Sequence, residues 1–132
     1  MANVIYDLGR ESFLKGEISW DADNIVTVLV DLADYTANVA TDQFITSVPA
    51  GARVAVSGNL ASKTTTDGSA DAADVTFSSV TGDISEALVI YQNTGVEGTS
   101  RLIAYIDTAT GLPVTPNGGD IQVQWSAPIF TL

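Results

Sequence analysis

Carboxylates are the side chains of this sequence with the widest chemical use. Its 132 residues include 16 Asp and Glu, 5 Lys and Arg, and neither Cys nor His. Because thiols and imidazoles are absent, thiolate nucleophiles, Ser–His and Cys–His catalysis, and thiolate or imidazole zinc sites are excluded. The remaining chemistry is a carboxylate pair acting as acid and base, a Lys or Tyr base, or a cation site made of oxygen ligands alone.

Two oxygen-rich clusters could hold a calcium ion, which takes about six to eight oxygen ligands. The clusters are Asp21 and Asp23 with Asn24, and Asp67, Asp71 and Asp74. An EF-hand loop requires an acidic or amide residue at its first, third and fifth positions. If Asp21 is the first position, the fifth is Ile25, which cannot be a ligand through its side chain. We therefore expect solvated turn aspartates, with no bound metal or cofactor; a weak cation site at either cluster is the alternative.

The chain is expected not to be an enzyme. Sixteen acidic residues supply pairs at suitable separations in any fold, so their number does not indicate glycosidic hydrolysis. No Gly-rich phosphate-binding loop of the Walker or Rossmann type follows a predicted strand. A chain of this length also leaves little room for a deep cleft beside its own core. No catalytic residue is therefore predicted.

The formal charge of −11 excludes nucleic acid as the partner. Phosphate binding requires clustered Lys and Arg. The basic residues are instead scattered along the chain: Arg10, Lys15, Arg53, Lys63 and Arg101. No secretion signal is expected, because charges interrupt the first apolar residues. No membrane span is expected either, because the longest apolar run, residues 25–30, is far shorter than the about 20 residues that cross a bilayer.

The segment of residues 1–16 predicts a short N-terminal helix. Apolar residues recur in it at spacings of three to four, with charged residues on the opposite side. They are Val4, Ile5, Leu8, Phe13 and Leu14. Gly9 costs such a helix about 1 kcal/mol relative to alanine, and Gly16 favours its end just after Lys15.

After residue 16 the periodicity becomes strand-like, because β-branched and aromatic residues alternate with polar ones. Residues 17–20 and 25–32 predict a hairpin joined by a turn at residues 21–24. One face of its second strand carries Val26, Val28 and Val30, and the other carries Ile25, Thr27 and Leu29. Both faces look at least partly covered, so we expect this strand to be central in its sheet.

Further strands are predicted at residues 53–56, 60–66, 75–79, 86–92, 101–107, 120–125 and 128–132, and one helical turn capped by Thr41 at residues 41–45. Residues 88–94 and 102–108 resemble each other, which we interpret as the two paired strands of one hairpin. Leu102, Ala104 and Ile106 are expected to share a face. The pattern predicts a mainly β fold: an antiparallel β-sandwich or jelly-roll-like barrel with a short N-terminal helix, in one domain spanning residues 1–132.

Several fold-forming stretches follow one another along most of the chain. They are Tyr6, Gly9-Arg10, Phe13-Leu14, Gly16-Glu17-Ile18, Val28-Leu29-Val30-Asp31 with Tyr35, Leu60-Ala61-Ser62-Lys63-Thr64, Asp74-Val75-Thr76-Phe77, Ala87-Leu88-Val89-Ile90-Tyr91 with Asn93-Thr94-Gly95, and Leu102-Ile103-Ala104-Tyr105-Ile106-Asp107. In these stretches the chain resembles small virion structural proteins of tailed bacteriophages, of the head decoration or cement type. The motifs form a fold rather than a catalytic site, so the resemblance brings no catalytic residue.

The resemblance implies a protein that binds the outer surface of an assembled icosahedral head and fastens neighbouring capsid subunits together. The implied partner is the major capsid protein, and the protein itself could be a trimer. Its implied location is the outer surface of the virion head, and the host cytoplasm during assembly.

We expect the capsid contact to involve residues 2–17 and the loop at residues 35–49, because a helix with an apolar face is easily ordered against a partner. The candidate contact residues are Val4, Ile5, Leu8, Phe13, Leu14, Tyr35 and Phe44. The alternative for the N-terminal ones is that they cover one open end of the protein's own core.

Two other functions are compatible with the sequence. A phage tail, fibre or host-attachment module would share the β fold and the acidic surface, and it predicts exposed aromatic residues at a loop tip. A small carbohydrate-active enzyme would require two carboxylates facing one cleft, one of them with a raised pKa.

Overall fold

The three longest strands of the chain are its most continuous apolar runs. The computed structural model describes residues 3–125 and 128–132, so residues 1–2 of the predicted N-terminal helix lie outside the described residues. The strands are β1 (Val4–Ile5), β2 (Ile25–Val30), β3 (Arg53–Val56), β4 (Ser69–Ala70), β5 (Val75–Phe77), β6 (Ala87–Gln92), β7 (Leu102–Ile106), β8 (Ile121–Val123) and β9 (Phe130–Thr131). The helices are α1 (Asp7–Leu14) and the 3-10 turns η1 (Ile45–Ser47), η2 (Ala50–Ala52), η3 (Thr66–Gly68) and η4 (Glu97–Thr99).

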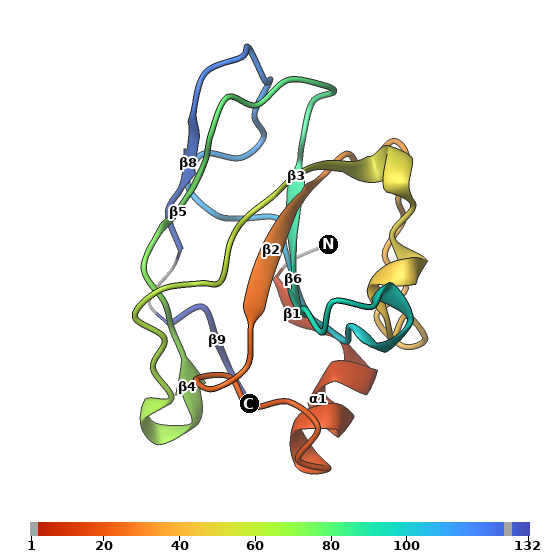
Figure 1. The fold of residues 1–132 in the computed structure, drawn as a ribbon, viewed down its shortest axis with the longest axis vertical. Helices are drawn as coiled ribbons and strands as arrows, with labels where there is room; N and C mark the ends of the chain where they lie inside the picture. The colour runs from red at the N-terminus through yellow and green to blue at the C-terminus, as the bar shows by residue number, and fades with distance from the viewer. Residues whose placement is uncertain (1–2, 126–127) are drawn as a thin grey trace.

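A five-stranded antiparallel sheet in the order β1-β7-β6-β2-β3 forms the middle layer (Figure 1). The two-stranded sheets β4-β9 and β5-β8 lie on one side of it, and the chain between β2 and β3 lies on the other, with α1 at the lower end of the view (Figure 1). The described residues are thus mainly β with one short α-helix, and the arrangement is compatible with the predicted β-sandwich.

The predicted central strand is confirmed in β2, which pairs with β6 on one edge and β3 on the other. All six of its residues are buried. Ile25 and Leu29 belong to the core beneath the small sheets. Val26, Val28 and Val30 belong to a second core on the opposite face. The sequence pattern had assigned the same residues to the same two faces.

The second core is covered by loops rather than by another sheet. Ile45 and Val48 from the segment around η1 pack there, together with Tyr6 and Tyr35. Each of these four side chains is at most 5% exposed. Both faces of the central sheet are therefore sealed, as expected for strands without polar alternation.

The predicted hairpin of residues 86–92 and 101–107 is confirmed as β6 paired with β7. Its register shifts, because Tyr91 pairs with Leu102 and Ile90 pairs with Ala104, so Ile103 is the extra residue of a bulge. The bulge moves Leu102 to the second core while Ala104 stays in the first. The prediction that Leu102, Ala104 and Ile106 share a face is wrong for Leu102.

The predicted N-terminal helix is shorter than expected, because Val4 and Ile5 form β1 instead. Val4 pairs with Tyr105 and Ile5 pairs with Ala104 along the edge of β7. A strand neighbour satisfies the polar backbone of that edge, which outweighs the helical spacing of the side chains. The helix begins at Asp7 and ends at Leu14.

Three other predicted elements differ from the prediction in the described residues. Residues 17–20 form no strand, since β3 and β6 already occupy both edges of β2. Residues 60–66 contribute only a single bridge at Thr64, since Ser62 takes a φ of 54° that a strand does not tolerate. The turn predicted at residues 41–45 begins later, at Ile45, since Phe44 is held extended in a bridge to Arg101.

Candidate functional site

The structure distributes the seven predicted contact residues between core and surface. Ile5 and Tyr35 are buried. Half-buried positions are held by Val4, Leu8, Phe13 and Phe44. Leu14 is 84% exposed, the largest value among the large hydrophobic residues described. Leu14 is therefore the predicted contact residue most available to a partner.

The two segments predicted to make contact lie against each other. The hydroxyls of Tyr6 and Tyr35 are 2.8 Å apart, and the Tyr35 hydroxyl donates to Oδ2 of Asp42 at 2.8 Å. The amide of Asp7 donates to the carbonyl oxygen of Val39 at 2.8 Å. These bonds fasten the start of α1 to the loop that follows β2.

Burial raises the pKa of both hydroxyls of this tyrosine pair. The nearby Asp42 carboxylate raises them further, because a second negative charge would be repelled. Both side chains therefore stay neutral well above the ordinary pKa of tyrosine, and their hydroxyls act as hydrogen-bonding groups rather than bases.

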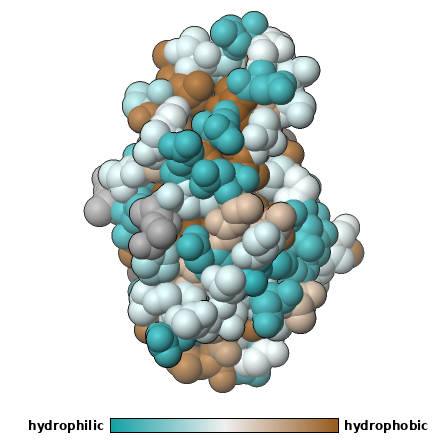
Figure 2. All heavy atoms as spheres, turned by 90° about the vertical axis from the view of Figure 1, so that its left-hand side faces the viewer, coloured by the Kyte–Doolittle hydropathy of each residue, from teal (hydrophilic) through white to brown (hydrophobic). Residues whose placement is uncertain are grey.

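An apolar surface lies at the end of α1, and we call it the apolar end. It consists of Phe13, Leu14, Trp20, Phe130 and Leu132. All but Leu14 line a cavity of about 220 Å³. Leu132 is 52% exposed, and Figure 2 shows hydrophobic side chains at the lower end of the molecule, where α1 lies in Figure 1. Such a surface suits contact with another protein.

Aromatic contacts shape the cavity of the apolar end. The rings of Trp20 and Phe130 meet edge to face, with centroids 5.2 Å apart and planes at 85°. The rings of Phe13 and Phe130 also meet, with centroids 6.2 Å apart and planes tilted at 49°. The indole nitrogen of Trp20 donates to the carbonyl oxygen of Asp71 at 3.1 Å. The cavity wall is therefore held in place by elements from both ends of the chain.

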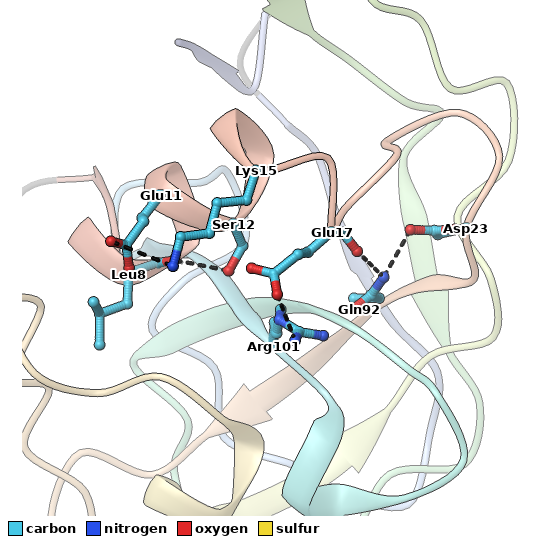
Figure 3. Close-up of polar contacts among 8 residues, drawn as sticks. All are labelled: Leu8, Glu11, Ser12, Lys15, Glu17, Asp23, Gln92 and Arg101. Carbon is cyan, nitrogen blue, oxygen red and sulfur yellow. Dashed lines mark hydrogen bonds and ion pairs between the residues drawn. The ribbon is translucent and has the colours of Figure 1, made fainter.

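A polar cluster anchors the chain just after α1 to the central sheet (Figure 3). A guanidinium nitrogen of Arg101 lies 3.1 Å from Oε2 of Glu17. The side-chain amide nitrogen Nε2 of Gln92 donates to the backbone carbonyl oxygen of Glu17 at 2.9 Å and to Oδ2 of Asp23 at 2.7 Å. Gly16, with a φ of 74°, ends the helix in a left-handed conformation that suits glycine. Together these contacts position Leu14 at the surface.

The aspartates singled out in the sequence bond mainly to nearby backbone or side chains. Oδ2 of Asp23 accepts from the amide of Ser19, and Oδ1 of Asp71 accepts from the amide of Ala72. Oδ1 of Asp74 instead accepts from the amide of Trp125, 51 residues away. The bonds of Asp23 and Asp71 to residues close in sequence are typical of aspartates in turns.

A different acidic group comes together in three dimensions. Asp31, Asp34 and Asp83 each bring a carboxylate oxygen within 4.8 Å of the other two. Oxygen ligands of this kind suit a hard cation such as Ca²⁺. Asp31 is buried, and its Oδ1 already accepts from the amide of Ala33 at 2.9 Å. Sequence reasoning missed this group because Asp83 belongs to a distant part of the chain.

None of the described helices is long and apolar enough to cross a membrane. No protein-family model matches the chain, and no curated protein matches it either.

Proposed function

We propose that this protein is a non-enzymatic decoration protein of a tailed-phage head, which binds the outer surface of the shell and stabilises contacts between capsid subunits. The ordered motifs of the chain, which resemble those of such proteins, support the proposal. The proposed partner is the major capsid protein, and the proposed location is the outside of the virion head, after a period in the host cytoplasm.

The observation that carries the proposal is the apolar end. Leu14 is 84% exposed, and Phe13, the residue before it, lines the aromatic cavity. Covering one leucine side chain fully is worth about 1.5–3 kcal/mol. A partner that buries Leu14 and fills the cavity therefore gains affinity from a surface that is already formed.

The physical role of such a protein follows from mass action. A subunit that binds only the assembled lattice stabilises that lattice, and the effect multiplies over many copies. The net charge of −11 keeps densely decorated particles apart, which favours their solubility. Because the chain has no Cys, its stability on the particle does not depend on thiol–disulfide redox conditions.

Co-sedimentation with undecorated shells tests the proposal. Wild-type protein is expected to pellet with mature shells, whereas Leu14→Glu is expected to bind at least about tenfold more weakly, which corresponds to about 1.4 kcal/mol. The matched control is Ile84→Glu, since Ile84 is 51% exposed in the loop between β5 and β6. Failure of the wild type to pellet, or equal losses in both variants, would contradict the proposal. Thermal melting of each variant establishes that it is folded.

The tail or fibre alternative predicts exposed aromatic residues at a loop tip. The exposed large hydrophobic residues of the described chain are all aliphatic: Leu14, Val56, Ile84, Val96 and Leu132. This pattern favours the decoration proposal over a receptor-binding tip. A pull-down against purified host envelope separates the two, because only the alternative predicts retention.

A further inference from the structure

A second cavity, of about 300 Å³, opens between the two layers of the fold at the edge of the central sheet. We call it the β1 groove. It is lined by Asn3, Val4, Ile5, Arg10, Ala104, Ile106, Ile129, Phe130 and Thr131. The apolar part of its lining, which we call its floor, includes the buried residues Ile5, Ala104 and Ile129, and the polar part consists of Asn3, Arg10 and Thr131. Apart from Phe130, it shares no residue with the cavity of the apolar end.

Within residues 3–125 and 128–132, both strands that border the β1 groove have a free edge. β1 is the outermost strand of the five-stranded sheet and pairs there only with β7. β9 pairs there only with β4. An open edge presents backbone donors and acceptors that can pair with a further extended chain. The groove therefore offers hydrogen-bonding partners along one wall and apolar surface beneath.

Arg10 supplies the positive charge on the rim of the β1 groove. The other four basic side chains bond within the fold: Lys15 to Glu11, Arg53 to Glu97, Arg101 to Glu17, and Lys63 to the Asp23 carbonyl oxygen and to Asn59. The guanidinium of Arg10 makes no ion pair or hydrogen bond with any described residue. In a chain with 16 acidic residues, this leaves a cation whose planar group suits a carboxylate from outside.

We propose that the β1 groove binds an extended segment of a partner polypeptide that carries an acidic side chain. The segment pairs with the free edge of β1, one apolar side chain enters the space above Ala104 and Ile106, and its carboxylate meets Arg10. Side chains alternate along an extended chain, so neighbouring residues can serve these separate purposes.

An extended peptide fits these features better than a free anion does. A small anion would leave the apolar floor of Ile5, Ala104 and Ile129 uncovered, and it would make no use of the β1 edge. The net charge of −11 repels acidic ligands at long range, but salt screens this repulsion beyond about 8–10 Å. For a bound peptide, the attraction between its carboxylate and the adjacent Arg10 is therefore the main electrostatic interaction. The inference goes beyond the proposed function, because it concerns a second surface and does not require a capsid.

Panning a display library of random peptides of about eight residues against the immobilised full-length chain tests the proposal. We expect enriched sequences that combine β-branched residues with one Asp or Glu. The leading peptide is then synthesised, and its affinity is measured by fluorescence anisotropy. Arg10→Glu is expected to weaken binding at least about tenfold, and replacing the peptide's acidic residue with lysine is expected to restore binding to that variant.

Lys15→Glu is the matched control, since Lys15 follows α1 directly and its substitution changes the charge by the same amount. It is expected to keep the affinity within about twofold. Amide chemical shifts at Val4, Ile5 and Ile129 should move on peptide binding, and Leu14→Glu should leave the affinity unchanged. No enriched sequence, enrichment without an acidic residue, or equal losses in both charge variants would overturn the proposal. So would shifts confined to the apolar end, because the peptide would then occupy that surface.

Discussion

Replacing Gly9 with alanine tests how α1 is seated on the sheet. A Cβ atom at this position would lie 2.5 Å from the carbonyl oxygen of Leu102 and 3.2 Å from Cα of Ile103. Both are backbone atoms of β7, so neither can rotate away as the end of a side chain could. Alanine is worth about 1 kcal/mol more than glycine inside a helix, but overpacking against a rigid neighbour costs up to about 3 kcal/mol. We expect Gly9→Ala to lower the free energy of unfolding by about 2 kcal/mol.

Urea unfolding followed by tryptophan fluorescence measures this change, since Trp20 is in the apolar end beside α1. Gly51→Ala is the control, because a Cβ atom at Gly51 meets nothing within 4 Å. It should match the wild type within about 0.5 kcal/mol. Helix propensity alone predicts that Gly9→Ala is stabilising, so a variant as stable as the wild type, or more stable, would refute close backbone packing between α1 and β7.

Three further predictions concern the packing on either side of the sheet. The free energy of unfolding should fall above about pH 10, because burial raises the pKa of Tyr6 and Tyr35 in the folded state and the unfolded chain loses its tyrosine protons first. Denaturation at several alkaline pH values should show this free energy falling by up to about 1.4 kcal/mol per pH unit for each tyrosine. A free energy that does not change with pH would contradict the prediction. Tyr35→Phe should cost about 1–3 kcal/mol in neutral urea unfolding, because it leaves the Tyr6 hydroxyl buried without its partner, and it should also reduce the alkaline slope; a cost near zero would mean that the pair adds no stability. Phe130→Ala should cost about 2 kcal/mol, below the about 3–5 kcal/mol of a fully buried phenylalanine, because its ring contacts Phe13 and Trp20 at a half-buried site. Thermal melting checks this value, and an unchanged melting temperature would show that the aromatic contacts are dispensable.

The strands that could be predicted from sequence are those in which local pattern and tertiary environment agree. β2, β6 and β7 are apolar on both faces, and a strand between two neighbours in a covered sheet requires that pattern. In β8, buried Ile121 and Val123 alternate with exposed Gln122, as a half-covered strand should. These strands can be assigned from local sequence alone, because the pattern of apolar and polar residues in each strand matches the burial of those residues in the fold.

The errors arise where a distant segment decides the backbone conformation. Val4 and Ile5 have helical spacing but form a strand, because the edge of β7 offers them hydrogen bonds. Phe44 is extended because it forms a β-bridge with Arg101, the residue directly before β7. The side chain of Leu102 changes face because a bulge at Ile103 alters the alternation. The first two causes are contacts between residues far apart in the chain, and the third is an irregularity within one hairpin; periodicity indicates neither.

The candidate surface was predicted only in part. Phe13 and Leu14 were identified from the apolar spacing of the helix, and both are in the apolar end. Phe130 and Leu132 were missed, although their spacing of two puts them on the face opposite buried Ile129. The signal was therefore present in the C-terminal strand, but only the fold brings that strand beside α1.

The position of the two surfaces follows from how the central sheet is covered. Both of its faces are sealed, one by the small sheets and one by the loops between β2 and β3, so a partner can reach only ends and edges. Arg10 and Leu14 stand four residues apart on α1, which puts them on neighbouring turns of the same helix face. A partner held at the apolar end therefore has its next residues close to the β1 groove, where a second contact becomes intramolecular and gains from effective concentration. The seating of α1 through Gly9 thus sets the geometry of both contacts at once.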